Sequence, residues 1–238
     1  MILMTRRKLV TVLYTRLNRH KFNLIVKCFA NDITALAAAS IVGTNRNTVN
    51  RYYNYFRQLI IIDEKRKRQE FQVIKKVEAD ESYFGPNRVK GKRGRGAGGK
   101  IIVFGLLKRN GYVYTQILSD ATRESVMPII RQVVTSGSDI YTDGWRSYDA
   151  LAVYGYNHKK VVHEDNEFTK EDETHINGIE SFWSWTKRRF VKFNGIPKRL
   201  FTDYLLESEW RFNMRGRIVK ELKRVLKRPI VVNNLSRF

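Results

Sequence analysis

Residues 175–190 constrain the fold of this chain most, because their pattern requires a helix with one largely apolar stripe and one polar line. The side chains of the stripe recur at helical spacing and are Ile179, Phe182, Trp183, Thr186 and Phe190. Such a stripe packs against a sheet. The polar line carries Glu180 and Lys187 about two turns apart, so a carboxylate and an ammonium project together. Taken alone, this line is also explained by an amphipathic helix with a solvated side.

Two carboxylates earlier in the chain favour a divalent-metal site. Asp80 lies inside a strand-like run, residues 74–84, and Asp143 ends another, residues 139–143. Mg²⁺ prefers oxygen ligands and usually keeps several waters, so two or three carboxylates are enough to bind it. We therefore predict that Asp80, Asp143 and Glu180 form a metal site together.

Five sequence blocks follow one another in a specific order. They are residues 80–85 (DESYFG), 90–97 (KGKRGRGA), 141–144 (YTDG), 175–183 (HINGIESFW) with Lys187, and 209–215 (EWRFNMR). In this order they resemble the DDE transposases of bacterial insertion sequences, in the group related to the eukaryotic Merlin elements. The resemblance covers residues 74 to 215, and five ordered blocks carry far more weight than a single Asp-Gly pair.

The resemblance implies a transposase that binds insertion-sequence ends and performs DNA cleavage and strand transfer. In such chemistry two Mg²⁺ ions, for which Mn²⁺ can substitute, activate water and stabilise the leaving oxygen. Asp80 is expected to bridge both ions, and Asp143 and Glu180 to hold one each. Because some relatives use asparagine near the third ligand, Asn177 is the fallback for Glu180. Lys187 is expected to hold a DNA phosphate or a terminal base.

The expected order of elements fits a ribonuclease H-like fold, an α/β fold in which helices flank a mixed sheet. The expected strands are residues 74–84, 101–107, 112–118, 139–143 and 159–163, and the expected helices are residues 124–134, 145–154, 175–190 and 199–215. In this fold the first and fourth strands are neighbours. Asp80 and Asp143 would therefore meet, although they are far apart in the sequence.

Other acidic residues near these blocks have simpler explanations than metal binding. Asp120 precedes an expected helix, whose first turn a carboxylate can cap. Glu207 and Glu209 are expected to form ion pairs with Arg211 and Arg215.

An alanine-rich stretch before these blocks predicts a helix-turn-helix at about residues 31–58. One helix ends near Gly43 and a second follows at about residues 44–57. Ala39, Gly43 and Val49 occupy the small, turn and core positions that close helix crossing requires. The exposed side chains of the second helix, which can donate to DNA bases and phosphates, are Arg46, Asn47, Asn50 and Arg51. An ordinary helical hairpin without a role in DNA binding is the alternative.

The charge of the chain points to a polyanionic partner. Its 45 Lys and Arg against 23 Asp and Glu give a formal net charge of +22, which favours double-stranded DNA bound in a salt-sensitive manner. The glycine-rich stretch at residues 85–100 cannot build a core, so it is either a flexible connection or an arm that contacts DNA. The basic side chains predicted to contact DNA outside the helix-turn-helix are Lys92, Arg93, Arg95, Lys187 and Arg188.

Four segments are expected along the chain. They are a helical DNA-binding module at residues 1–64, a linker at 65–73, the catalytic domain at 74–215 and a basic amphipathic tail at 216–238, which can contact DNA or a partner protomer. The single cysteine, Cys28, rules out a disulfide within one chain, and the four-cysteine zinc ribbon of many relatives is missing. No apolar run reaches the ~18 residues of a membrane span, so we expect a cytoplasmic protein associated with the chromosome.

Moving a DNA element requires two ends to be joined, so a homo-oligomer on DNA is expected. The alternatives are a ribonuclease H-like nuclease without strand transfer and a transposon-derived DNA-binding protein without catalysis. A recognition module ahead of the catalytic domain disfavours the first alternative, and the presence of all three carboxylates disfavours the second. The sequence assigns no terminal repeat, target site, oligomer size or current mobility of the element, and no role to His163 and His175.

Overall fold

The computed structural model describes residues 17–69, 76–85, 100–109, 111–143, 151–161 and 176–227. The chain forms two compact units, one comprising residues 1–66 with 214–238 and the other comprising residues 67–213. Among the described residues, no helix combines the length and the apolar character that crossing a bilayer requires.

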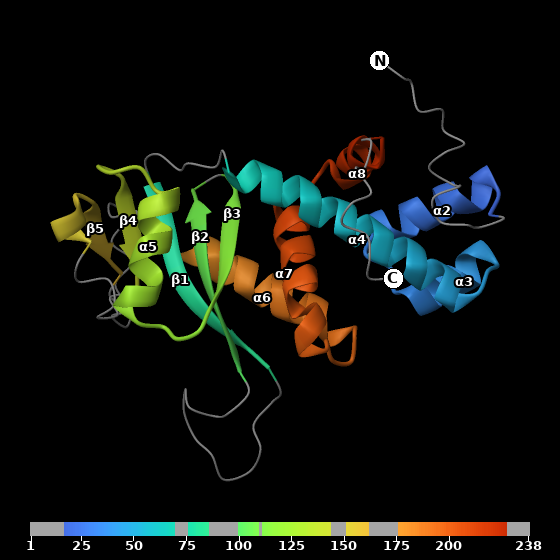
Figure 1. Cartoon of the computed structure of the whole chain (residues 1–238), viewed down its shortest axis with the longest axis horizontal. Helices are drawn as coiled ribbons and strands as arrows, with labels where there is room; N and C mark the ends of the chain where they lie inside the picture. Colours follow the sequence, from blue (N-terminus) through green and yellow to red (C-terminus); the bar gives the residue numbers. More distant parts are fainter. Residues whose placement is uncertain are drawn as a thin grey trace, which may run out of the picture. The chain divides into compact units, whose positions relative to one another are not determined.

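The larger unit is built on a five-stranded mixed sheet (Figure 1). Its strands are β1 (Lys76–Phe84), β2 (Ile101–Lys108), β3 (Val113–Leu118), β4 (Asp139–Thr142) and β5 (Asn157–Lys160). They lie in the order β3-β2-β1-β4-β5, in which β1 is antiparallel to β2 and parallel to β4. This arrangement confirms the predicted ribonuclease H-like fold class, including the adjacency of the first and fourth strands.

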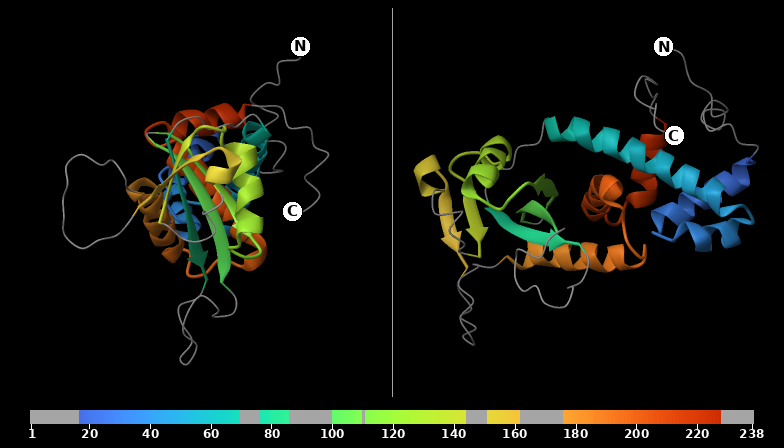
Figure 2. Two further views of the ribbon diagram at one scale, coloured as in Figure 1. Left: turned by 90° about the vertical axis from the view of Figure 1, so that its left-hand side faces the viewer. Right: turned by 60° about the horizontal axis from the view of Figure 1, so that its bottom comes forward.

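Helices cover both faces of this sheet, as Figure 2 shows. They are α5 (Arg123–Val133) on one face, and α6 (Asn177–Val191) and α7 (Lys198–Asn213) on the other. Alternation along β1 explains the division, because successive side chains of a strand point to opposite faces. Val77 and Ala79 pack in the core beneath α5, whereas Phe84 packs with Ile179 and Trp183 of α6. Asp80 lies four residues before Phe84 on the same strand, so its side chain points to the same face of the sheet, toward α6.

The expected helix after Asp120 is present as α5, and Thr122 rather than Asp120 is its N-cap. Asp120 supports this cap from outside the helix. Its Oδ1 accepts hydrogen bonds from the Thr122 hydroxyl at 2.6 Å and the Ser125 hydroxyl at 2.6 Å. These hydrogen bonds lower the pKa of Asp120 to about 2. The predicted capping residue is therefore wrong, and Asp120 instead holds the capping residue Thr122 and Ser125 in the first turn.

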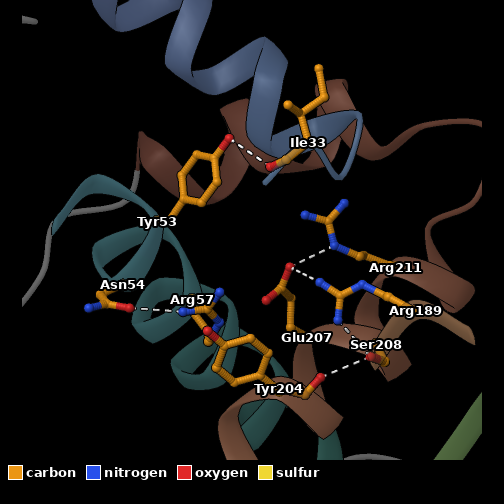
Figure 3. Close-up of polar contacts among 9 residues, drawn as sticks. All are labelled: Ile33, Tyr53, Asn54, Arg57, Arg189, Tyr204, Glu207, Ser208 and Arg211. Carbon is orange, nitrogen blue, oxygen red and sulfur yellow. Dashed lines mark hydrogen bonds and ion pairs between the residues drawn. The ribbon is translucent and has the colours of Figure 1, made fainter. Parts of the chain in front are cut away.

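A buried ion-pair network joins α6 to α7. Glu207, which is 1% exposed, accepts from Arg211 Nε at 2.7 Å and also from Arg189 Nη2, and Figure 3 shows both guanidinium groups pointing at its carboxylate. Arg189 also donates to the Ser208 hydroxyl at 2.8 Å. The predicted pairing of Glu207 with Arg211 is confirmed.

For Glu209, the prediction that its partner is Arg211 or Arg215 is wrong. Glu209 Oε2 accepts from Arg68 Nη2 at 2.6 Å and from the Thr115 backbone N at 2.7 Å. The reason is that Glu209 is buried against β3, so its partners come from segments distant in sequence, which helical spacing cannot indicate. The guanidinium of Arg68 lies 4.4 Å from the centre of the Tyr114 ring, which completes this cluster.

The smaller unit is helical. Its helices are α2 (Arg19–Ala30), α3 (Ala35–Val42), the N-terminal part of α4 (Arg46–Gln69) and α8 (Ile218–Leu226). Gly43 ends α3 at a φ of 63°, a left-handed conformation that glycine adopts readily, and the Thr44 N–H closes the turn on Ala39 O at 3.0 Å. The two predicted helices around Gly43 are therefore present.

The core of this unit is aromatic. Phe29 packs edge-on against Tyr53 and Phe56, and the Tyr53 hydroxyl donates to Ile33 O at 3.1 Å (Figure 3). Cys28 is buried, as expected, and burial raises the pKa of its thiol.

Three expected boundaries need correction. Residues 65–69 of the expected linker are the last turns of α4, because its Lys, Arg and Gln residues are good helix formers and contain no breaker. The expected tail begins with α8, which belongs to the helical unit: Leu222 is buried there and Arg224 Nη2 bonds Asp63 Oδ2 at 2.8 Å. The strand expected at 159–163 is β5, which begins at Asn157, two residues earlier than expected, and ends at Lys160, three residues earlier than expected.

Parts of other predictions lie outside the described residues. Of the helix expected at 145–154, the described part is a single 3-10 turn at Ala152–Tyr154. Lys92, Arg93 and Arg95 of the glycine-rich stretch, together with His163 and His175, also lie outside the described residues.

Candidate active site

Asp80 lies near the middle of β1, half-buried and facing α6. The indole N–H of Trp183 donates to its Oδ2 at 3.0 Å. Gly105 of β2 is the direct cross-strand partner of Asp80, and a Cβ at this position would collide with the Trp183 ring. Glycine at 105 therefore gives the indole the room to reach the carboxylate.

Asp143 follows β4 directly, where the parallel register carries it beside Asp80. Val77 pairs with Ile140, and Glu78 pairs with Tyr141. Asp80 lies two residues after Glu78, and Asp143 lies two residues after Tyr141. Asp143 is exposed. The structure thus brings together the two aspartates that the sequence predicted to meet.

The third predicted carboxylate, Glu180, projects from the first turn of α6 and is exposed. Its charge reaches Asp80. Burial and then the charge of Asp143 raise the pKa of Asp80 to about 6, and the charge of Glu180 adds to this effect. Asn177, the fallback ligand, starts the same helix and is also exposed.

Lys187 lies two turns farther along α6 on the same side of the sheet. Its Nζ is 5.6 Å from the centre of the Phe84 ring. Burial and the positive charge of Lys100 lower the pKa of Lys187, whereas the charge of Asp80 opposes this shift. An ammonium group therefore shares the site with the carboxylates. The adjacent Arg188 is exposed and bonds the hydroxyl of Ser184.

The donor set suits a hard divalent cation. Asp80, Asp143 and Glu180 offer only carboxylate oxygens, the ligands that Mg²⁺ prefers. Burial raises the pKa of Asp80 most, and repulsion from Asp143 and Glu180 adds to the rise; a cation between the carboxylates would relieve this repulsion. As the side chains stand, no three His, Cys, Asp or Glu residues within the described ranges are gathered closely enough to enclose one ion.

The residues predicted to contact DNA from the helical unit lie on the first two turns of α4. Arg46, Asn47 and Arg51 are exposed and Asn50 is half-buried, whereas Val49 on the opposite side is fully buried. Asn45 Oδ1 accepts from the Asn47 backbone N at 2.7 Å, which fixes the start of the helix.

Sequence reasoning missed several residues that shape the site. The sequence pattern places Trp183 only in the apolar stripe, although its indole also donates to Asp80. The sequence pattern gives no role to Gly105 or to the buried Glu78. A signal for Glu78 was available, because it lies two residues before Asp80 and so faces the same side of the sheet.

Comparison with known sequences yields consistent matches. A profile of the ISXO2-like transposase domain matches residues 72–213. A transposase-like protein of Haemophilus influenzae is 45% identical over 101 residues, which cover 42% of this chain and 80% of that protein. A protein in the transposable element ISH50 of Halobacterium salinarum is 32% identical over 148 residues, covering 59% of this chain and 50% of that protein. The chain therefore spans only half the length of this second relative.

Among solved structures, complexes of the Mos1 transposase are distantly similar. The Mos1 strand transfer complex has a TM-score of 0.32 and 10% identity, covering 89% of this chain and 78% of that chain. The paired-end complex with the left transposon end has a TM-score of 0.27 and 12% identity, with the same coverage. The relation to the Merlin elements stays a prediction.

Proposed function

Because the chain belongs to the ISXO2-like transposase family, we propose that it is a DNA transposase that binds insertion-sequence ends and catalyses metal-dependent cleavage and strand transfer. The observation that supports this most is the register of β1 and β4, which carries Asp143 beside Asp80. Glu180 approaches the same point from α6 and influences the pKa of Asp80. Three carboxylates, contributed by β1, the end of β4 and the start of α6, on one side of the sheet support this proposal.

In this proposal Asp80, Asp143 and Glu180 would hold two Mg²⁺ ions, or Mn²⁺ in their place, which activate the attacking oxygen and neutralise the leaving one. Trp183 fixes the orientation of Asp80 by donating to its Oδ2. Lys187 supplies a positive charge beside the carboxylates, suited to a phosphate of the bound DNA.

The helical unit is proposed to recognise the DNA ends as a helix-turn-helix. Arg46, Asn47, Asn50 and Arg51 lie at the start of α4, the part of a recognition helix that reads base edges. The net charge of +22 supports additional contacts with phosphates, from Arg188 among others, and hence a strong dependence on salt.

The active species is proposed to be a homo-oligomer, most simply a dimer that bridges two ends and acts on the chromosome in the cytoplasm. The high positive charge should keep free protomers apart, and DNA should neutralise it and draw them together. Light scattering with and without end-containing DNA would show the change. A complex with one protomer that still joins two ends would contradict this part of the proposal.

A strand-transfer assay with DNA that carries the flanking ends of the gene tests the function itself. Wild-type protein with Mg²⁺ should nick these ends and join them to target DNA, and Asp80→Asn should do neither while still binding. Nicking without joining would instead identify a nuclease. Binding by the wild type without any cleavage would identify a DNA-binding protein that has lost catalysis.

A further inference from the structure

A second carboxylate on β1 has no part in the proposed chemistry. Glu78 precedes Asp80 by two residues and faces the same side of the sheet. Its side chain is 2% exposed. A carboxylate buried to this degree needs partners, because leaving water is costly for a charge.

Both oxygens of Glu78 are engaged by the protein. Oε2 accepts from the backbone N of Ile179 at 2.9 Å, and Oε1 accepts from Arg109 Nε at 3.2 Å. The guanidinium of Arg109 is itself held 3.7 Å from the centre of the Tyr141 ring. Glu78 is thus committed to structural contacts and is not available as a metal ligand.

The contact with Ile179 caps the helix that carries Glu180. The first N–H groups of a helix have no partner within the helix, and the residue before α6, Ile176, has no side chain that could accept from them. Glu78 takes over this role from a neighbouring strand, where its negative charge also suits the positive end of the helix. Gly178 allows the close approach, because a Cβ there would lie 2.8 Å from Glu78 Oε2.

Two hydrogen bonds therefore align α6 with β1. Glu78 binds the backbone N of Ile179, and Asp80 binds the indole of Trp183. The two acceptor residues, Glu78 and Asp80, point to the same side of β1. The two donor residues, Ile179 and Trp183, are four apart on α6 and so lie on one face of the helix. Glu180 follows Ile179 directly.

From this geometry we propose that Glu78 is a positioning residue that holds the first turn of α6 so that Glu180 stays beside Asp80. The inference rests on the proposed function, since it assigns Glu78 to the assembly of that metal site. Arg109 acts through Glu78, because its guanidinium fixes the carboxylate from the other side.

The test uses the full chain and two loss variants of the same kind. Glu78→Met keeps the length of the side chain but removes the acceptor. Glu209→Met removes another buried carboxylate, 2% exposed, whose described partners are Arg68 and Thr115 rather than α6.

Two milder variants complete the set. Glu78→Gln is the conservative variant, because its amide oxygen can still accept from Ile179. Arg109→Met is the milder variant, which leaves the Ile179 contact in place.

The first readout is the binding of Mn²⁺, which is monitored through the rise in melting temperature as the metal is titrated. Glu78→Met should raise the half-saturating Mn²⁺ concentration by roughly 10-fold or more, as mutation of the groups that orient metal ligands typically does. Glu78→Gln should keep this concentration close to that of the wild type. Arg109→Met should shift it less, in the same direction. Glu209→Met should lower the melting temperature without moving the Mn²⁺ midpoint.

The second readout is hydrogen exchange of the α6 backbone amides, which needs neither metal nor DNA. Glu78→Met should speed exchange at Ile179 and its neighbours, and Glu209→Met should not. Equal Mn²⁺ midpoints for wild type, Glu78→Met and Arg109→Met would overturn the positioning role alone. If Mn²⁺ does not raise the melting temperature of the wild type, or raises that of Asp80→Asn equally, the proposed metal site is overturned together with this inference.

Discussion

The indole N–H of Trp183 on α6 donates to Asp80 Oδ2 on β1 at 3.0 Å, within the proposed active site. This contact ties the central carboxylate to the helix that carries the third one. It requires glycine at 105, because any larger residue there would displace the ring. A residue of the apolar core thereby acts on the geometry of the site.

Trp183→Phe should slow DNA cleavage by roughly 10-fold, the cost of about one hydrogen bond, because phenylalanine keeps an aromatic ring but cannot donate to Asp80. Rates of single-turnover cleavage with pre-bound DNA would measure the effect. Trp185→Phe is the matched control, since Trp185 packs against Phe182 and Phe212. Equal rates for both variants would show that the indole N–H has no role in orienting Asp80.

Glu180→Gln should abolish cleavage and leave the binding of element ends largely intact, because the proposed ligand contacts metal rather than bases. Asn177→Ala, on the same helix, should retain cleavage. Cleavage assays and gel-shift binding of both variants in Mg²⁺ would separate the two candidates. The opposite pattern, an active Glu180→Gln and an inactive Asn177→Ala, would move the third ligand to Asn177.

Arg46→Ala combined with Arg51→Ala should weaken binding to element ends and flatten its dependence on salt. Each lost phosphate contact reduces the slope of log K against log salt concentration by about 0.9. Fluorescence anisotropy over a series of salt concentrations would measure both quantities. The control replaces two exposed basic residues of α2, Arg19 and Lys27, by alanine. If this control weakens end binding as much as the α4 variant does, recognition does not depend on the start of α4.

Glu207→Met should destabilise the larger unit by about 3–5 kcal/mol, because it removes the buried carboxylate that pairs with the buried guanidinium groups of Arg189 and Arg211. Chemical denaturation would measure the loss in the free energy of unfolding. Glu124→Gln removes an exposed carboxylate that pairs with Arg123, and should change stability very little. Similar losses in the two variants would contradict the importance assigned to the buried network.

Much of this fold is visible in the sequence because its strands and helices have strong periodic patterns. Val77 and Ala79 alternate with Glu78 and Asp80 along β1, and the two sets face opposite sides of the sheet. The fold class then predicts that β1 and β4 are neighbours. The meeting of Asp80 with Asp143 follows from these two facts alone.

Contacts between elements were harder to predict, because they depend on distances that no local pattern records. The capping of α6 by Glu78 requires the register of a helix on a strand, and the two partners are about a hundred residues apart. The pairing of Glu209 with Arg68 has the same origin. The amphipathic character of α8 was evident, but the site at which it packs was not, since Leu222 fits any apolar surface equally well.

The most direct test of the central claim is a crystal structure of the protein bound to end-containing DNA and Mn²⁺, with the metal located by its anomalous scattering. The account predicts manganese bound by Asp80, Asp143 and Glu180, with Lys187 at a DNA phosphate. Manganese bound elsewhere while these three carboxylates hold none would contradict it.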